Sequence, residues 1–345
     1  MLHTSKNRVA IIGAGVAGAT CARLLSDAGF QVDVFEKSRG VGGRMSTRRT
    51  EWTEREGVIH TAHFDHGVPG FKASTPEFLG FMDRGSASGV LARWQPRIVL
   101  SGDQVKTEAD WWVATPNMSA WCRHLLVDSK VTFSCHINSL RQTASGWMLE
   151  STEEMIRQTF DAVILAIPPL QAAALLQPHC TSWSDQAQTL SLLPNWVLMG
   201  VTNEIVPAFN WDIYRATSDP LALIIRNDTK PQRVQTAGFI NWVVHANHDW
   251  SKVNLESRVE DVEAALKTAV ADELGCPLDW YRSSVHRWRY ASVSANTHSG
   301  SSNHHWWSRD LKLGVCGDAW SREGGVEGAW CSAYALAVEL MNSGC

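Results

Sequence analysis

The sequence predicts an α/β protein of two domains, one of which is interrupted in the chain by the other. Three observations lead to this fold class: a strand–helix–strand pattern opens the chain, a strand-and-helix pattern closes it, and segments of mixed type lie between them. At 345 residues the chain is long enough for two domains. We therefore expect one discontinuous domain made from both ends of the chain, with a second domain inserted into it.

The first pattern covers the opening residues of the chain. An apolar run predicts a strand at 9–12, helical spacing predicts a helix at 16–28 that Gly29 ends, and a second strand is expected at 31–35. The turn between the first strand and the helix reads GAGVAG. Its context, after a strand and before a helix, predicts a Rossmann-type βαβ unit.

Each glycine of this turn has a role in dinucleotide binding. Gly13 permits the tight turn, Gly15 lets the backbone approach a pyrophosphate, and Gly18 lets the helix pack against the strand. The N–H groups that begin the helix, at Val16 and Ala17, would bind the phosphates. Glu36 ends the second strand, where a carboxylate can accept a hydrogen bond from a ribose hydroxyl.

A second glycine-rich turn follows the ribose carboxylate at once. Lys37 is followed by the run GVGGRM, which contains Gly43, Arg44 and Met45. This turn has no role in a simple NAD site. In a flavin enzyme it would let the backbone pass close to the cofactor while Arg44 offers charge to the pyrophosphate or the flavin edge.

The middle of the chain supplies elements to both domains. We expect a helix at 118–127, strands at 131–135, 147–149 and 160–167, and then mixed material with a helix at 259–274 and strands at 195–201, 222–225 and 238–244. The polar segment 292–303 predicts a surface loop.

The end of the chain offers a second anchor for the same cofactor. A strand at 311–316 runs into Gly317 and Asp318, and a glycine-rich turn opens a helix at 327–341. Asp318 could accept a hydrogen bond from a ribityl hydroxyl. The helix start could stabilise negative charge at the flavin pyrimidine ring, through Gly325, Val326, Glu327 and Ala329.

Together these segments resemble the FAD-dependent monoamine-oxidase-like superfamily, and within it the renalase-like branch. Besides the two anchors, four motifs match in order, namely FDHG at 64–67, DAVILAIPP at 161–169, WVVHA at 242–246 and HRWRYA at 286–291. The resemblance implies a discontinuous Rossmann-type FAD-binding domain and an α+β substrate domain with a mixed or antiparallel sheet that covers the flavin ring. The expected bounds are 1–75, 115–170 and 306–345 for the first domain, and 76–114 and 171–305 for the second.

The resemblance also implies an activity and some of its residues. Renalase-like enzymes oxidise isomeric dihydronicotinamides, and dioxygen reoxidises the flavin to give hydrogen peroxide. By resemblance, Ile137 contacts the adenine through its backbone, and His66 and Gly67 lie beside the noncovalent FAD. His66, His245, Trp288 and Tyr290 are the candidates for the substrate cavity and for catalysis.

One stretch departs from the renalase-like pattern. Pro69, Gly70 and Ser74 stand where that branch has Gln, Tyr and Arg. A neutral serine cannot replace the bidentate contact of an arginine, so the substrate is left open at this point. Lys72 and Arg289 are alternative sources of the missing charge.

Composition excludes several other classes. A net charge of -4 argues against a sequence-independent nucleic-acid binder, and no apolar stretch is long enough for a membrane span. The N-terminal residues show no secretion signal, so we expect a cytoplasmic protein. Its cysteines occur singly along the sequence, and we expect them to be free thiols. His304 and His305 lack further ligands at suitable spacing, so no metal site is expected.

We conclude that the sequence predicts an FAD-dependent oxidase of a small cyclic or nitrogen-containing substrate. Two alternatives stay open on the same scaffold: an oxidase of amines or amino acids, or a desaturase of rings. A flavin-binding protein without turnover is a third alternative.

Overall fold

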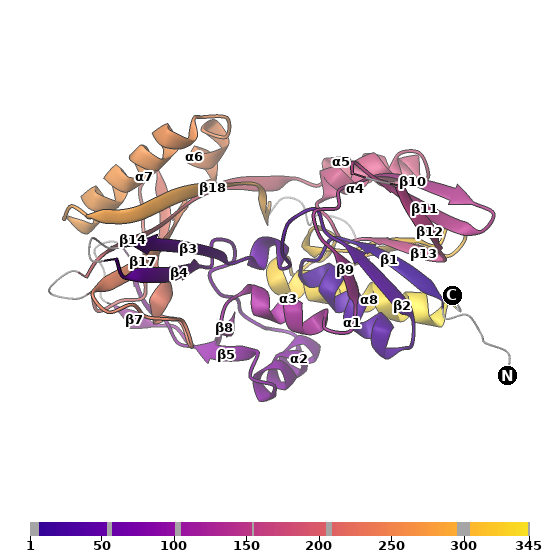
Figure 1. The fold of residues 1–345 in the computed structure, drawn as a ribbon, viewed down its shortest axis with the longest axis horizontal. Coiled ribbons are helices and arrows are strands. Elements are labelled where there is room, and N and C mark those ends of the chain that lie inside the picture. The colour runs from indigo at the N-terminus through magenta and orange to yellow at the C-terminus, as the bar shows by residue number, and fades with distance from the viewer. Residues whose placement is uncertain are drawn as a thin grey trace. The chain divides into compact units, whose positions relative to one another are not determined.

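The structure is a computed structural model, and it describes residues 7–53, 57–100, 105–153, 155–204, 209–294 and 304–343. The chain forms two compact units (Figure 1). The first consists of Met1–Gly43, Trp121–Ser191 and Val293–Cys345, and the second of Arg44–Ala120 and Leu192–Ser292. The helix α3 (Ser119–Leu125) lies where the chain passes from the second unit to the first.

The first unit is built on a six-stranded sheet. Its strand order is β19 (Trp306–Ser308), β20 (Leu313–Val315), β13 (Ala162–Leu165), β1 (Arg8–Ile12), β2 (Gln31–Phe35) and β9 (Lys130–Thr132). All pairs are parallel except β19 with β20. Near-continuous apolar sequence in β1 and β13 suits strands that are covered on both faces. In this order β1 lies between β13 and β2. The chain first adds β2 on one side of β1 and later adds β13 on the other side. The ends of these strands therefore form a topological switch point.

Helices cover one face of this sheet and a smaller sheet covers the other. α1 (Val16–Asp27) packs against α8 (Gly325–Asn342), and the two helices lie side by side in Figure 1. The opposite face packs into one apolar core with β10 (Ile137–Thr143), β11 (Gly146–Ser151), β12 (Met155–Phe160), α4 (Pro169–Leu176) and α5 (Thr181–Thr189). Both ends of the chain therefore contribute to one unit.

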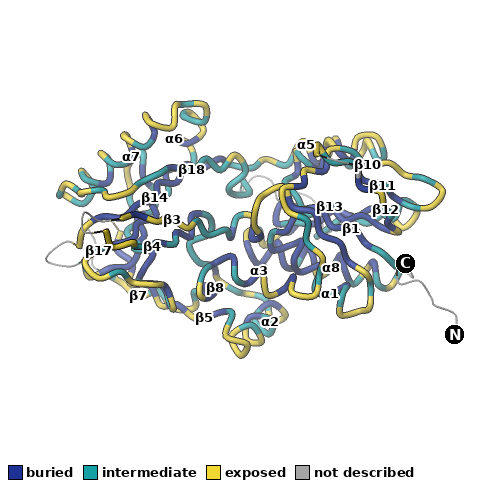
Figure 2. Tube along the Cα trace, in the orientation of Figure 1, coloured by how far each residue is buried: buried dark blue, intermediate teal, exposed yellow. Residues whose placement is uncertain are grey.

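The second unit is built on a seven-stranded sheet. Its order is β18 (Trp280–Val293), β14 (Leu192–Asn203), β17 (Phe239–Ala246), β16 (Leu221–Arg226), β15 (Ile213–Arg215), β6 (Arg97–Leu100) and β7 (Lys106–Thr107). The sheet is mixed, because β15 pairs with β6 in parallel while β14, β17 and β16 pair antiparallel. α7 (Val259–Leu274) covers one face, with apolar side chains toward the sheet and an exposed outer side (Figure 2).

Smaller elements complete the second unit. They are the hairpin of β3 (Arg48–Thr53) and β4 (Ile59–Phe64), the pair of β5 (Leu91–Trp94) and β8 (Trp111–Ala114), and the helices α2 (Pro76–Ala87) and α6 (His248–Val253). β4 also packs against β17 of the large sheet. This contact brings the end of β4 close to the face of the sheet that α7 does not cover.

The predicted α/β fold class is confirmed, with a Rossmann-type sheet in one unit and a mixed sheet in the other. The run at 160–167 is not one strand, because it contains the end of β12 and, after Asp161, the separate strand β13. By their contacts, the described residues of 44–75 belong to the second unit, and residues 171–191 belong to the first. Most of the predicted loop at 292–303 lies outside the described residues, from 295 onward. In the part of the chain that is described, no helix is long and apolar enough to cross a membrane.

Candidate functional site

The GAGVAG turn of the first unit leaves no room for side chains. Gly13 has a φ of +104°, and a Cβ atom on it would lie 2.4 Å from the carbonyl oxygen of Ala166. A Cβ atom on Gly18 would lie 1.9 Å from the carbonyl oxygen of Gly13. The turn therefore needs glycine at both positions so that β1, β13 and α1 can meet. Val16 and Ala17, which begin α1, are buried there.

Gly15 differs from Gly13 and Gly18 because a side chain on it would meet open space. The nearest atom to a Cβ on Gly15 would be the Cα of Gly43, 4.0 Å away. Gly43 itself has a φ of +52°, and Gly42 donates a backbone hydrogen bond to Ala14 at 2.9 Å. Two glycine-rich segments thus pass each other at the end of β1 with only backbone between them. Such a surface can be approached closely by a phosphate group.

The carboxylate of Glu36 lies beside this turn. One of its oxygens, Oε2, accepts a hydrogen bond from the backbone of Ala14 at 2.8 Å, and Oε1 accepts one from the backbone of Ser38 at 2.8 Å. Glu36 is buried. A carboxylate has about four acceptor positions, so these two bonds orient the group and leave capacity for a ligand hydroxyl.

The C-terminal segment approaches the same end of the sheet. β20 is parallel to β13, which is parallel to β1, so Cys316 and Gly317 follow their strand at the edge where Gly13 follows β1. The Sγ atoms of Cys21 in α1 and Cys316 lie 3.8 Å apart, so the N-terminal and C-terminal segments of the chain are in contact. Asp318 is buried, and α8 begins at Gly325 with Val326, Glu327 and Ala329 buried in its first turns.

The remaining expected cofactor residues fall in both units. Lys37 and Ile137 belong to the first unit, where the exposed Lys37 contacts Gln171 at 3.4 Å and the buried Ile137 begins β10. Arg44, Met45, His66 and Gly67 belong to the second unit. A Cβ on Gly67 would lie 1.8 Å from the carbonyl oxygen of Arg44, so a side chain is excluded there too.

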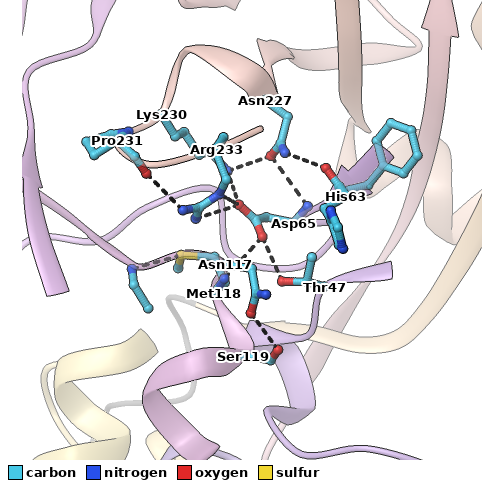
Figure 3. Close-up of polar contacts among 12 residues, drawn as sticks. Thr47, His63, Asp65, Asn117, Met118, Ser119, Asn227, Lys230, Pro231 and Arg233 are labelled. Atoms are coloured by element: carbon cyan, nitrogen blue, oxygen red, sulfur yellow. Dashed lines mark hydrogen bonds and ion pairs between the residues drawn. The ribbon is translucent and has the colours of Figure 1, made fainter. Parts of the chain in front are cut away.

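A buried charged cluster in the second unit is centred on Asp65 (Figure 3), the residue that precedes His66 in the sequence. Asp65 Oδ2 contacts Lys230 Nζ at 3.1 Å and Arg233 Nε at 2.9 Å, while Asp65 Oδ1 accepts hydrogen bonds from Thr47 Oγ1 and the backbone of Met118. Asn227 Oδ1 also accepts a hydrogen bond from Lys230, at 2.9 Å. The side chains of Lys230 and Arg233 are 0% and 2% exposed. Two cations thus share one carboxylate away from water.

Burial and charge act in opposite directions on this cluster. Burial alone raises the pKa of Asp65, but the attraction of Lys230 and Arg233 outweighs it and holds that pKa well below its usual range. Burial lowers the pKa of Lys230 to about 8, although Asp65 opposes the shift. Contacts from three other segments of the chain, at Thr47, Met118 and 227–233, therefore fix Asp65 at the end of β4 and the residues that follow it.

The ring of His66 packs with two other aromatic rings, those of Trp288 and His286. It stacks on Trp288 with 5.3 Å between ring centroids and meets His286 edge-on at 4.8 Å. Trp288 Nε1 donates a hydrogen bond to the carbonyl oxygen of His66 at 2.8 Å. Burial lowers the pKa of His66 to about 4, with help from His286 and Arg48, and burial with Arg48 lowers that of His286 to about 4. Both imidazoles are therefore neutral at pH 7.

The other two expected catalytic residues lie on strands of the second unit. Tyr290 lies two residues beyond Trp288 on β18 and is half-buried. His245, on β17, is a partly buried histidine whose Nδ1 lies 3.1 Å from Asn195 Oδ1. Burial lowers the pKa of His245 to about 3, and the nearby Lys230, His248 and His66 act in the same direction.

The stretch that departs from the renalase-like pattern has its own packing. A Cβ on Gly70 would lie 2.8 Å from the Trp111 ring, so tryptophan takes the space that a side chain at 70 would need. Ser74 is exposed. Lys72 forms an ion pair with Glu108 at 3.1 Å, and Arg289 forms one with Glu256. Each of these two charges therefore already has a counter-charge.

The sequence predicted the glycine-rich turns and Glu36, but it did not predict the charged cluster or single out His286. Lys230 and Arg233 stand in a segment, 226–233, that carries no glycine pattern or catalytic spacing. The available signal was two basic residues in the segment that follows an apolar strand. That signal is equally typical of an exposed loop.

The first comparison with known proteins concerns the class of domain. Residues 11–84 match the family model described as an NAD(P)-binding Rossmann-like domain. This match covers the GAGVAG turn, Glu36 and the second glycine-rich turn.

Solved structures share the whole fold. A putative protoporphyrinogen oxidase from Exiguobacterium sp. 255-15 superposes with a TM-score of 0.73 at 10% identity, over 98% of this chain and 99% of that one. Cyclohexylamine oxidase from Brevibacterium oxydans IH-35A gives a TM-score of 0.66 at 15% identity, over 97% and 100%. The chain therefore has the fold of these oxidases.

Curated relatives match over shorter stretches. The tRNA 5-methylaminomethyl-2-thiouridine biosynthesis bifunctional protein MnmC of Magnetococcus marinus is 30% identical over 54% of this chain and 33% of its own length. The L-amino-acid oxidase of Siganus canaliculatus is 50% identical over 14% of this chain and 9% of its own length. The chain thus matches a third or less of the length of either relative.

Proposed function

We propose that the protein is an oxidoreductase that holds FAD noncovalently in its first unit and binds a small nitrogen-containing or cyclic substrate in its second. The observation that carries the proposal is the arrangement at the switch point of the six-stranded sheet. There Gly13, Gly15 and Glu36 lie at the ends of neighbouring parallel strands, and Gly317 follows a third strand at the same edge. A simple NAD site does not need the C-terminal anchor.

The residues present fit the proposed cofactor. Backbone N–H groups at Gly15 and the start of α1 would bind the pyrophosphate, and the open space at Gly15 leaves room for it. Glu36 would accept a hydrogen bond from the adenosine ribose, and Asp318 one from the ribityl chain. Residues 11–84 match the family model of an NAD(P)-binding domain. We attribute this match to the geometry of the dinucleotide-binding turn, which NAD(P) and FAD sites share.

FAD bound at this site would supply the redox chemistry, namely hydride transfer from the substrate, with dioxygen as the proposed electron acceptor and hydrogen peroxide as the product. The protein contributes binding and electrostatics. His66 and His286 are neutral at pH 7, so with Trp288 they offer an aromatic surface without charge to the substrate. The cluster around Asp65 would hold that surface rigid.

The proposed substrate is an amine, or a nitrogen ring such as the dihydronicotinamide isomers that renalase-like enzymes oxidise. An uncharged aromatic surface favours flat or cyclic compounds. The shared fold with a cyclohexylamine oxidase supports this class. The positive charges of Lys72 and Arg289 are paired, so they offer little to a substrate phosphate.

Anaerobic mixing of the purified protein with single substrates tests this function. We expect cyclic amines or dihydronicotinamide isomers to bleach the visible flavin absorbance, and we expect hydrogen peroxide when air is admitted. His66→Phe should slow bleaching while flavin content is kept. A flavin that no member of the panel bleaches would favour a flavin-binding protein without turnover.

A further inference from the structure

The three-stranded sheet of the first unit, β10 to β12, covers only part of the six-stranded sheet. β11 packs against β13, and β12 packs against β1. β2 and then β9 follow β1 in the order of the larger sheet, and β12 is the last strand of the smaller one. The surface of the larger sheet therefore continues past β12, and a groove lies beside that strand, over β2 and β9.

Buried apolar side chains form the base of this groove. They are Phe35 of β2, Cys135, which follows β9, and Ile156 of β12. All three also belong to the apolar core between the two sheets, so packing fixes the base in place. The groove has a volume of about 400 Å³, which is at the lower end of the range for small-ligand pockets. A ligand body of one or two rings suits a space of this size.

Two neutral polar side chains, those of Thr132 and Gln158, also line the groove. Thr132 of β9 is the parallel partner of Phe35, so both side chains lie on the same face of the larger sheet. Gln158 stands between Ile156 and Phe160, two core residues of β12, and alternation turns it toward the same side. Both polar side chains are half-buried, and neither forms a hydrogen bond to another described residue. They are therefore available to a ligand.

The charged residues that line the groove are both basic. Lys130 Nζ lies 3.7 Å from Asp33 Oδ1, but Arg8 Nε lies 3.3 Å from the other oxygen of the same carboxylate. Two cations thus share one counter-charge. Arg157 is exposed and forms no ion pair with any described residue. The groove therefore carries an excess of positive charge beside an apolar base.

We propose that this groove is a binding site for a small organic acid, with the ring body on Phe35 and Ile156 and the anionic group between Lys130 and Arg157. Exposed basic residues by themselves are typical of an ordinary solvated surface. Here they stand beside a recess with a buried aromatic base and with two polar side chains that have no partner among the described residues. That combination matches a ligand with an apolar ring and a negative group.

The groove is separate from the proposed FAD site. None of the residues that line it is expected to hold the cofactor. Glu36 follows Phe35 in the chain, but its carboxylate bonds to the backbone of Ala14 and Ser38, neither of which lines the groove. The inference therefore goes beyond the proposed function and does not depend on it.

Binding is tested with three probes of one shape, namely 2-naphthoate, 2-naphthamide and 2-naphthylmethylammonium. Each is titrated into the protein as purified, with its isoleucine methyl groups labelled with ¹³C, and Ile156→Val assigns the methyl resonance of Ile156. We expect naphthoate to shift this resonance and to bind about three- to tenfold more tightly than the neutral amide, since exposed ion pairs are individually weak. High salt should reduce that preference, and the ammonium should bind most weakly. No shift by naphthoate, or equal affinities for all three probes, would overturn the inference.

Charge substitutions test which residues hold the anion. Arg157→Gln and Lys130→Gln should each weaken naphthoate binding about two- to fivefold and leave naphthamide binding unchanged. Arg141→Gln is the matched control, because Arg141 is an exposed cation on β10, at the other edge of the small sheet, and does not line the groove. Equal losses in Arg141→Gln and Arg157→Gln, or no loss in the two groove variants, would contradict the assignment.

The flavin separates this test from that of the proposed function. Naphthoate should bind the holoprotein without releasing FAD, and release of FAD by naphthoate would place the probe in the cofactor site and refute a separate groove site. A purified protein without flavin would contradict the proposed function but not this inference, because the shift of the Ile156 methyl resonance is measured in either case.

Discussion

The two units build their binding surfaces by different means. In the first unit the surface is backbone: Gly13, Gly15 and Gly18 leave main-chain atoms bare at the end of a sheet. In the second unit it is side chains, held by a buried carboxylate, Asp65, that two cations share. An added side chain at Gly13 or Gly18 would disrupt the first surface, whereas loss of the charge of Asp65 would disrupt the second. The two kinds of surface are therefore disrupted by different substitutions, and mutations can separate them.

The largest effect is expected from Asp65→Asn. This change leaves Lys230 and Arg233 buried without a counter-charge, and breaking a buried ion pair costs about 3–5 kcal/mol. Urea denaturation at pH 7 should show a loss of that size. Asp128→Asn is the matched control, because it breaks an ion pair to Arg23 in which Asp128 is 66% exposed, and such pairs contribute about 0–1 kcal/mol. Similar losses in both variants would refute the role of burial.

A smaller loss of stability is expected when a side chain is added to the first unit. Gly18→Ala puts a methyl group against the carbonyl oxygen of Gly13, and such overpacking costs about 1–3 kcal/mol. Gly40→Ala is the control, because a Cβ there meets no atom within 4 Å. Thermal unfolding of both proteins, compared with the wild type, measures the difference. A fully stable Gly18→Ala protein would mean that the turn can open.

A substitution that contacts only the ligand should weaken ligand binding without changing the stability of the protein. A methyl group on Gly15 clashes with no protein atom but occupies the proposed pyrophosphate space, so Gly15→Ala should weaken FAD binding while the apoprotein unfolds as the wild type does. Glu36→Ala removes a charged hydrogen-bond acceptor worth about 1.5–3 kcal/mol, or about ten- to hundredfold in affinity. Titration of FAD into apoprotein, followed by fluorescence, measures both. Unchanged affinity in Glu36→Ala would mean that another residue holds the ribose.

A pH dependence of stability is also expected in the second unit. The pKa of His66 is about 4 in the folded chain, below the ordinary histidine value of 6.5, so the unfolded chain binds the proton first as pH falls. Stability is therefore lost below about pH 6.5, by about 2 kcal/mol at pH 5 for this residue alone. Urea midpoints of the apoprotein at pH 7 and pH 5 should differ less in His66→Phe than in the wild type. An equal difference would assign the effect to other groups.

The contrast between the units also explains what the sequence could predict. The turn at Gly13–Gly18 and Glu36 could be predicted because contiguous residues form it and each glycine has a local reason. The charged cluster could not be, because Thr47, Asp65, Met118 and Lys230 are distant in sequence and only tertiary packing joins them. The division of the run at 160–167 was missed because apolar character alone does not mark the break at Asp161 between β12 and β13.

The central claim is that the backbone surface of the first unit holds FAD. Acid precipitation of the purified protein, with chromatography of the supernatant, tests it most directly. We expect a yellow protein that releases one FAD per chain and leaves a colourless pellet, and a Gly15→Ala protein that releases far less. Colour that stays in the pellet would contradict noncovalent binding, and release of NAD or FMN in place of FAD would contradict the cofactor assignment itself.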